Sequence, residues 1–309
     1  MSLRLATRKS RLALWQAETT RALLDAARPG EPSQLVEIES HGDLDRVQEI
    51  ARLGRTGVFT AAIDDAVLGG RADVGVHSMK DMTTELPEGL VLAGCLARGP
   101  VEDAFLSRDG AGLSQLPAGA RVATGSVRRV AMLRRARPDL ELVGIRGNVE
   151  TRIAKLDAGE ADALILAQAG LVRLGLADRT VELLSTPHFL PAVGQAIVGL
   201  TCRADDETTR ARLWAVTDRE SFAEALAERA LLRQLHGGCN APVGARARAR
   251  ESALGVQAVV VSSDGTRAIE DTVSGPSERA EELGRALAER LLEQGAGALI
   301  EEARSHPKA

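Results

Sequence analysis

Tyrosine is absent from this chain, and aromatic residues make up only 2% of its 309 residues. Proteins that stack nucleic-acid bases need aromatic rings, so this shortage argues against a single-strand-binding protein. The chain also lacks a basic excess, because 39 Lys and Arg face 43 Asp and Glu, for a net charge of -4. We therefore expect neither a nucleic-acid partner nor an anionic membrane surface. No apolar run reaches the roughly 18 residues that a membrane span requires.

Cysteine is scarce as well. Cys95, Cys202 and Cys239 are far apart, and no Cys-x-x-Cys pair occurs. This spacing favours a reducing compartment over a disulfide framework. Charges interrupt the first ten residues, so no signal peptide is expected, and we predict a cytoplasmic protein. The five histidines show no metal-binding spacing, and we predict no metal.

Arginine, in contrast, gathers in segments that contain glycine. Arg128 and Arg129 follow Gly125, and Arg146 and Arg152 flank Gly147 and Asn148. A planar guanidinium matches a carboxylate or phosphate, and tight turns supply free backbone N–H groups beside it. These clusters predict a cleft that holds a small polyanionic molecule.

The first two thirds of the chain alternate short apolar runs with amphipathic helical patterns. Such alternation predicts α/β layers with mostly parallel strands. Strands are expected at residues 3–6, 35–40, 72–77, 121–123, 140–145 and 163–167, and helices after Ser10 and at 59–68, 127–137 and 149–158.

From about residue 217 the pattern changes. A helix is expected at 222–235, a hairpin at 256–262 and 266–273 around Ser263-Asp264-Gly265, and a long helix at 277–294. This pattern indicates a separate α+β domain. A further boundary is expected near Arg98-Gly99-Pro100, and the polar segment 42–57 is interpreted as a mobile lid.

Three polar segments follow predicted strands. They are residues 77–81, 125–129 and 144–152. Ligands of open α/β sheets bind beyond the carboxyl ends of the strands, so we expect the three segments to share one site.

Six segments occur in the order and spacing of a known family. They read ATRKSRLALWQ (6–16), VHSMKD (76–81), GSVRR (125–129), IRGNVETR (145–152), LPAVGQ (190–195) and GGC (237–239). With them the chain, from residue 3 to its end, resembles the porphobilinogen deaminase (hydroxymethylbilane synthase) family. The resemblance implies two α/β domains like the halves of a periplasmic binding protein, and a C-terminal α+β domain. It places them at residues 1–97 with 194–216, at 98–193 and at 217–309.

The resemblance also implies an activity. The family's enzymes are transferases that condense four porphobilinogen molecules head to tail, release ammonia and hydrolyse the product to hydroxymethylbilane, in tetrapyrrole (haem) biosynthesis. By resemblance, Asp81 is the catalytic carboxylate, and Cys239 carries a dipyrromethane cofactor through a thioether. Cys95 and Cys202 lie in apolar contexts and are assigned to packing. A monomer is expected.

The remaining site residues are also carried over by resemblance. Those expected to bind the cofactor are Ser78, Lys80, Thr124, Ser126, Arg128, Arg129 and Arg152. Those expected to bind substrate are Arg8, Ser10, Gln16, Phe59, Arg146, Arg152, Arg173 and Gln195. Each pyrrole ring brings an acetate and a propionate, so a growing chain needs several arginines to hold it.

Plainer interpretations compete with these assignments. A loop Asp is usually solvated, a lone Cys is usually a small buried residue, and a surface Arg usually pairs with an acid. His77 is expected to orient its loop instead of acting as a base. A non-enzymatic anion-binding protein and a nucleic-acid-binding protein are the rival functions.

The chain departs from the family pattern at three places. Thr56 stands where the lid lysine is usual, Met82-Thr83 replace a proline-bearing turn, and Ala196 replaces a glycine.

Overall fold

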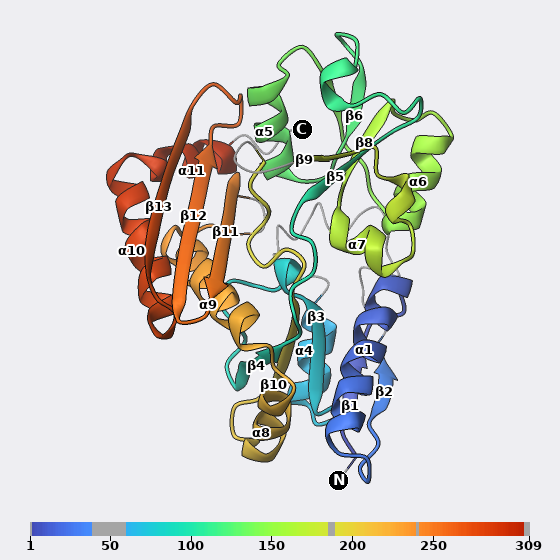
Figure 1. The fold of residues 1–309 in the computed structure, drawn as a ribbon, viewed down its shortest axis with the longest axis vertical. Helices are drawn as coiled ribbons and strands as arrows, with labels where there is room; N and C mark the ends of the chain where they lie inside the picture. The colour runs from blue at the N-terminus through green and yellow to red at the C-terminus, as the bar shows by residue number, and fades with distance from the viewer. Residues whose placement is uncertain (1, 39–59, 185–188, 239–240, 306–309) are drawn as a thin grey trace.

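The computed structural model describes residues 2–38, 60–184, 189–238 and 241–305. The predicted lid at 42–57, Phe59 and Cys239 lie outside these residues. Within them, no helix combines the length and the apolar character needed to cross a membrane. Three sheets organise the described chain (Figure 1).

The first sheet has five strands in the order β2-β1-β3-β10-β4. Helix α1 begins where the Ser10 side chain accepts the Ala13 N–H, as expected from the sequence. The strands are β1 (Arg4–Thr7), β2 (Gln34–Glu37), β3 (Val74–Ser78), β4 (Leu90–Cys95) and β10 (Val198–Arg203), and the helices are α1 (Arg11–Ala27), α4 (Ala61–Leu68) and α8 (Glu207–Ala215).

The second sheet also has five strands, in the order β7-β6-β8-β5-β9. Helices α5 and α6 follow β6 and β7 directly, and each begins at a polar residue, Ser126 or Asn148, whose side chain accepts a backbone N–H. The strands are β5 (Asp103–Ser107), β6 (Arg121–Ala123), β7 (Glu141–Val143), β8 (Ala163–Ala167) and β9 (Glu182–Leu184), and the helices are α5 (Val127–Ala136), α6 (Val149–Asp157) and α7 (Gln168–Arg173).

The expectation of mostly parallel strands is confirmed, with one exception in each five-stranded sheet: four of the described strands run in one direction and the fifth runs against them. Strand β10 runs antiparallel to both β3 and β4, and β5 runs antiparallel to both β8 and β9. Parallel pairs are confined to β1 with β2 and β3, and to β6 with β7 and β8. The first sheet is mixed because the chain leaves it after β4 and returns to it as β10, against the direction of its neighbours. The second sheet is mixed because its first strand in the chain, β5, runs against β8 and β9.

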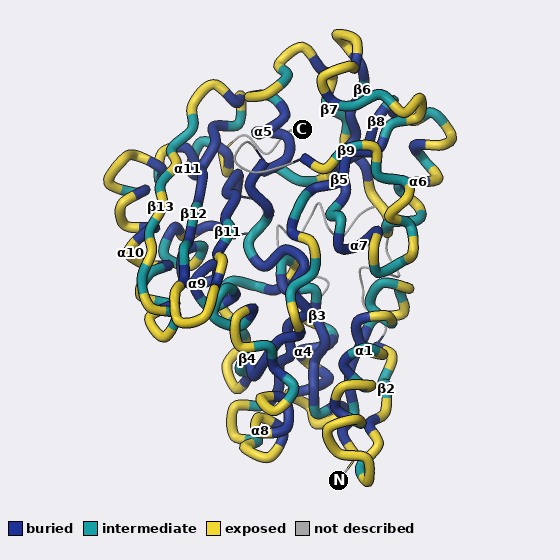
Figure 2. Tube along the Cα trace, viewed as in Figure 1, coloured by how far each residue is buried: buried dark blue, intermediate teal, exposed yellow. Residues whose placement is uncertain are grey.

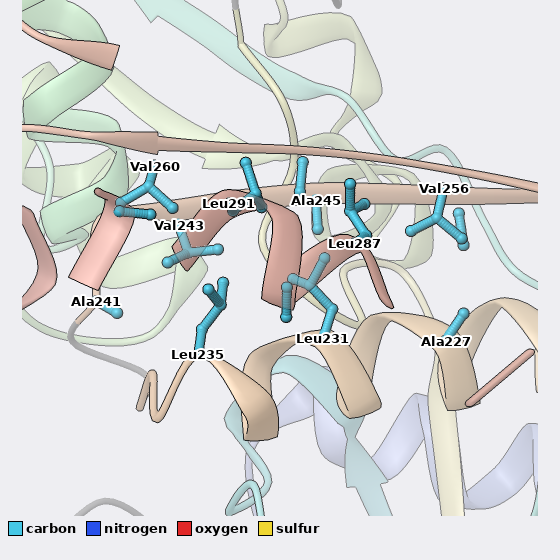
Figure 3. Close-up of a cluster of buried hydrophobic side chains, with 14 of the residues drawn as sticks. Ala227, Leu231, Leu235, Ala241, Val243, Ala245, Val256, Val260, Leu287 and Leu291 are labelled. Carbon is cyan, nitrogen blue, oxygen red and sulfur yellow. The ribbon is translucent and has the colours of Figure 1, made fainter. Parts of the chain in front are cut away.

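The C-terminal part contains a three-stranded antiparallel sheet. Leu231 and Leu235 of one helix, Leu287 and Leu291 of another, and valines of the strands form its core (Figure 3). The predicted hairpin is present with longer strands, and the predicted fold class is confirmed. The elements are α9 (Arg219–Gln234), β11 (Val243–Arg250), β12 (Ala253–Val261), β13 (Ala268–Pro276), α10 (Ala280–Glu293) and α11 (Ala296–Ser305).

The C-terminal sheet also packs against the second sheet. Val259 and Val261 of β12 belong to the same buried cluster as Met132 and Leu190. Most of the described central segments are buried, and exposed residues lie mainly at outer loops and helix faces (Figure 2). The loops between the three sheets therefore lie at a shared junction.

Candidate functional site

The first polar segment follows β3 as a short 3-10 helix, Met79–Asp81. Asp81 is exposed and Lys80 is partly buried. Burial lowers the pKa of the Lys80 ammonium; Asp81 raises it, whereas Arg129 and Arg152 lower it further. The loop of Asp81 therefore lies within electrostatic reach of arginines that come from the second sheet, as the strand-end argument predicts.

A pocket collects residues from all three parts of the fold. Lys80 comes from the first, Ser126 and Arg128 come from the second, and Gly238 comes from the C-terminal part. Gly238 immediately precedes Cys239 in the sequence. The full lining is Met79, Lys80, Met82, Thr84, Ser126, Arg128, Ala192, Val193, Arg229, Leu232, Gly238, Ala241 and Val243.

Arg128 and Arg129 share a buried carboxylate that sequence reasoning missed. Asp103 accepts hydrogen bonds at 2.7 Å from each guanidinium. Arg128 also donates to the Leu190 carbonyl at 2.6 Å, and Arg129 donates to the Ile165 carbonyl at 3.0 Å. Burial alone would raise the pKa of Asp103, but the two arginines hold it well below its usual range.

Gln195 belongs to the same network. Its side-chain amide donates to the Val101 carbonyl at 2.7 Å and to Asp103 at 2.9 Å, and the residue is completely buried. Many of the side-chain donors of Arg128, Arg129 and Gln195 thus form hydrogen bonds with other groups of the protein. The signal that could have revealed Asp103 is an acid at the start of the apolar run Ala104-Phe105-Leu106.

Thr124 and Ser126 shape the turn that opens α5. The Thr124 hydroxyl accepts the Ser126 N–H at 3.2 Å, and the Ser126 hydroxyl accepts the Arg129 N–H at 3.4 Å. Arg152 Nε donates to the Gly147 carbonyl at 2.8 Å. Burial and then Arg129 lower the pKa of Arg152, whereas Asp81 raises it. The two arginine-bearing turns therefore face the same region.

The described residues predicted to bind substrate lie on helices and loops beside the first two sheets. Gln16 on α1 donates to the Ser78 hydroxyl at 2.8 Å, which joins α1 to the end of β3. Ser10 is occupied as the N-cap of α1, and Arg8 lies partly buried just after β1. Arg146 is exposed in the turn before α6.

Arg173, at the end of α7, is mostly buried among neutral groups. It donates to the Ala196 carbonyl at 2.6 Å, and its guanidinium carbon lies 5.2 Å from the centre of the Trp15 ring. Burial lowers its pKa to about 10. Among the described residues, no acid contributes to this shift, and burial is its cause. A desolvated guanidinium of this kind gains from an incoming carboxylate. Ala196 has a φ of 72°, a conformation that favours the glycine usual at this position.

His77 lies beneath the loop of Asp81 and does not line the pocket. Its Nε2 is 3.1 Å from the Thr201 hydroxyl and 3.5 Å from an Asp64 oxygen. Burial, and then the charge of Arg229, lower its pKa to about 4. In the part of the chain that the structure describes, no group of acids, histidines or cysteines could hold a metal ion.

Comparison with known proteins identifies relatives over almost the whole chain. Two family models match: "Porphobilinogen deaminase, dipyromethane cofactor binding domain" over residues 3–211, and "Porphobilinogen deaminase, C-terminal domain" over residues 222–293. The porphobilinogen deaminase of Trichlorobacter lovleyi is 45% identical, covering 97% of this chain and 96% of the relative. That of Geobacter metallireducens is also 45% identical, covering 97% and 94%. A solved structure of the methionine binding protein MetQ is 12% identical and covers 70% of this chain and 89% of its own, with a TM-score of 0.46.

Proposed function

The chain belongs to the porphobilinogen deaminase family, and from this membership we propose that it condenses four porphobilinogen molecules head to tail. Each addition breaks the bond between an aminomethyl carbon and nitrogen, releases ammonia, and joins that carbon to the free α-position of the preceding ring. The new carbon–carbon bond is completed by loss of the α-proton. Water then releases the product as hydroxymethylbilane. The enzyme is a transferase of tetrapyrrole biosynthesis.

Asp81 is the proposed catalytic group. Departure of ammonia leaves a cationic azafulvene on the substrate, and a carboxylate beside the pyrrole N–H stabilises that cation. Such fixed charge combined with proton transfer contributes about 10²–10⁴ in rate. The exposure of Asp81 beside the partly buried Lys80 supports this role, because substrate can reach the carboxylate from solvent.

The dipyrromethane cofactor of this family supplies a free α-position to which the first ring couples. The residues present fit such a group, because Lys80, Ser126 and Arg128 offer cationic and hydroxyl donors to its carboxylates in one pocket. We propose Cys239 as the attachment residue, since Gly238 lines the same pocket. Ser78, Thr124, Arg129 and Arg152 are proposed to complete this binding region.

Arg8, Ser10, Gln16, Phe59, Arg146, Arg173 and Gln195 remain the proposed substrate-binding residues. Among them, Arg173 has the best support, because within the described ranges its mostly buried guanidinium donates to a carbonyl and lies over an aromatic ring but forms no ion pair. Arg128, Arg129 and Gln195 are proposed to act largely through Asp103, which orients them toward the pocket.

Domain limits, oligomeric state and compartment complete the proposal. The three sheets support domains at residues 1–97 with 194–216, 98–193 and 217–309. A reducing, cytoplasmic compartment agrees with the free, buried Cys95 and Cys202. A monomer is proposed with it. Sedimentation that gives a mass well above one chain would refute the monomer.

The observation that carries this function is the family match together with the pocket that joins Lys80, Arg128 and Gly238. Intact-protein mass spectrometry tests it. The purified protein should carry a covalent addition of two pyrrole units, and it should convert porphobilinogen to hydroxymethylbilane.

Cysteine variants locate the attachment. Cys239→Ala should lack the addition, whereas Cys95→Ala and Cys202→Ala, which remove buried thiols, should keep it. An unchanged addition in Cys239→Ala would assign the linkage to another residue. A wild-type protein of unmodified mass that does not turn over would refute the enzyme.

A further inference from the structure

The loop of Asp81 is tied directly to the loop that precedes Cys239. The Thr84 hydroxyl donates to the Gly237 carbonyl at 3.2 Å, although the two residues are 153 positions apart. Thr84 lies three residues after Asp81, and Gly237 lies two residues before Cys239. One hydrogen bond therefore joins two chain segments with different proposed roles. One carries the catalytic carboxylate of Asp81, and the other leads to Cys239, the proposed attachment residue of the cofactor.

A second contact joins the Asp81 loop to α9, the helix that leads into the loop before Cys239. Arg229 projects from α9, and its Nη2 donates to the carbonyls of both Thr83 and Thr84, at 2.9 and 3.0 Å. Arg229 is buried. A guanidinium donor that meets two successive carbonyls fixes both the position and the direction of the loop backbone.

The end of α9 makes this connection rigid. The Gly237 N–H donates to the Leu232 carbonyl at 3.0 Å, and the Ala241 N–H donates to the Gly238 carbonyl at 3.0 Å. A β-carbon on Gly237 would come within 2.6 Å of the Leu232 side chain, so the backbone packs tightly at this point. The Asp81 loop is thus held at two points, by Arg229 of α9 and by Gly237 in the turn that follows the helix.

We propose that Thr84 and Arg229 are positioning residues, which set the loop of Asp81 in register with the cofactor-bearing loop. The inference rests on the proposed roles of Asp81 and Cys239. The side chains of Thr84 and Arg229 line the pocket, and the hydrogen bonds described above run to backbone carbonyls of the two segments. Their effect comes through geometry, because a misplacement of about 1 Å between reacting groups can cost about 100-fold in rate.

The Thr84 series tests this proposal. Thr84→Val keeps the side-chain shape and removes the hydroxyl donor, and Thr84→Ser keeps the donor. We expect Thr84→Val to retain the two-pyrrole mass, to lower kcat about tenfold and to leave KM within about twofold, because positioning acts on the chemical step. Thr84→Ser should stay within about twofold of wild type in both constants.

Thr83→Val is the matched control. The Thr83 hydroxyl bonds within its own loop, to the Glu85 carbonyl at 2.5 Å, and does not cross to α9. Its loss should change kcat by less than about twofold. Wild-type kcat in Thr84→Val, or an equal fall in Thr83→Val, would overturn the proposal. Arg229→Lys keeps the charge but shortens the reach of the donor that meets both carbonyls, so it should lower kcat in the same direction as Thr84→Val.

Amide hydrogen exchange tests the contact between the two segments independently of whether the protein has the proposed activity. Amides of His236, Gly237 and Ala241 should exchange several-fold faster in Thr84→Val than in wild type, whether or not the protein turns over. Unchanged exchange would overturn the tether. Faster exchange in a protein that lacks the two-pyrrole mass would preserve the tether and refute the function.

Discussion

At the scale of single residues, one acid explains how two adjacent arginines come to be buried. Asp103 is fully buried between Arg128 and Arg129, and Gln195 completes its hydrogen bonds. The turn pattern predicted that these arginines lie near the site. It could not predict that a carboxylate 25 positions away would occupy one edge of each guanidinium, because that pairing depends on how β5 and α5 pack.

Asp103→Asn should remove much of this stabilisation. It leaves two buried guanidinium groups facing a neutral amide, and the free energy of unfolding should fall by about 3–5 kcal/mol. Because the pKa of Asp103 is depressed, its contribution is complete above about pH 4 and is lost as the pH falls further. Urea unfolding at pH 7 measures the loss. The exposed pair Asp157–Arg179 supplies the control, since Asp157→Asn should cost less than about 1 kcal/mol.

Asp64 has the opposite pH dependence. Burial raises its pKa to about 6, so the folded chain keeps a proton that the unfolded chain releases above about pH 4. The contribution of Asp64 to the free energy of unfolding therefore falls as the pH rises from 4 to 6, by up to about 3 kcal/mol, while the lowered pKa of His77 contributes a slope of opposite sign over nearly the same range. Asp64→Asn should remove the Asp64 contribution alone, and its stability relative to wild type should be greater at pH 7.5 than at pH 4.5. Urea unfolding of both proteins at pH 4.5 and 7.5 measures it; an equal difference at both values would contradict the assignment.

At the scale of elements, a helix protects the open edge of a sheet. Backbone N–H groups of Ala247, Ala249 and Glu251 donate to Glu228, Glu224 and Glu220 of α9. Residues four apart on a helix are separated by about 6 Å and alternate residues on a strand by about 6.7 Å, so the two periods match over three contacts. Edge N–H groups that would otherwise invite another strand are thereby satisfied.

Glu228 should matter most among the three carboxylates. It is completely buried, pairs with Arg98 at 2.7 Å and also accepts the Gly194 N–H. Glu228→Gln keeps one acceptor oxygen but removes the negative charge that pairs with the buried Arg98. The free energy of unfolding should therefore fall by about 3 kcal/mol. Glu220→Gln, at the solvent end, should change it by less than about 0.5 kcal/mol. Equal losses in thermal or urea unfolding would show that the carboxylates act only as hydrogen-bond acceptors.

Elements differ in how far the sequence could reveal them. Residues 121–123 and 163–167 are predicted and observed as strands with the same bounds, because turn residues and helices flank them. Strands β4 and β5 were not predicted. A short buried apolar run shows no alternation, so its pattern does not distinguish a strand from a helix. The antiparallel direction of β10 depends on a crossing between sheets, which no local pattern records.

At the scale of the whole molecule, the pocket depends on three sheets meeting at their ends. The positions of the polar segments after the strands predicted that the loop of Asp81 lies near the turns of Arg129 and Arg152. The structure agrees, because Asp81, Arg129 and Arg152 all shift the pKa of Lys80. Those positions did not reveal Arg229 and Thr84, which act across the junction. Residues that connect separate sheets carry no periodic signal, because their partners are set only after each part has folded.

The packing of β11 and β12 against the second sheet determines whether the first two thirds of the chain can be expressed without the C-terminal part. Gly244 approaches Met132 and Leu190 so closely that an added methyl would lie within 3 Å of both, and Val259 and Val261 complete that cluster. A truncated chain that ends before α9 would expose to water the apolar side chains of the second sheet's cluster that β11 and β12 cover, among them Met132 and Leu190. Residues 1–216 expressed alone should aggregate, whereas co-expression with residues 217–309 should yield a soluble pair. A monodisperse short fragment that unfolds cooperatively would instead make the C-terminal third a detachable module.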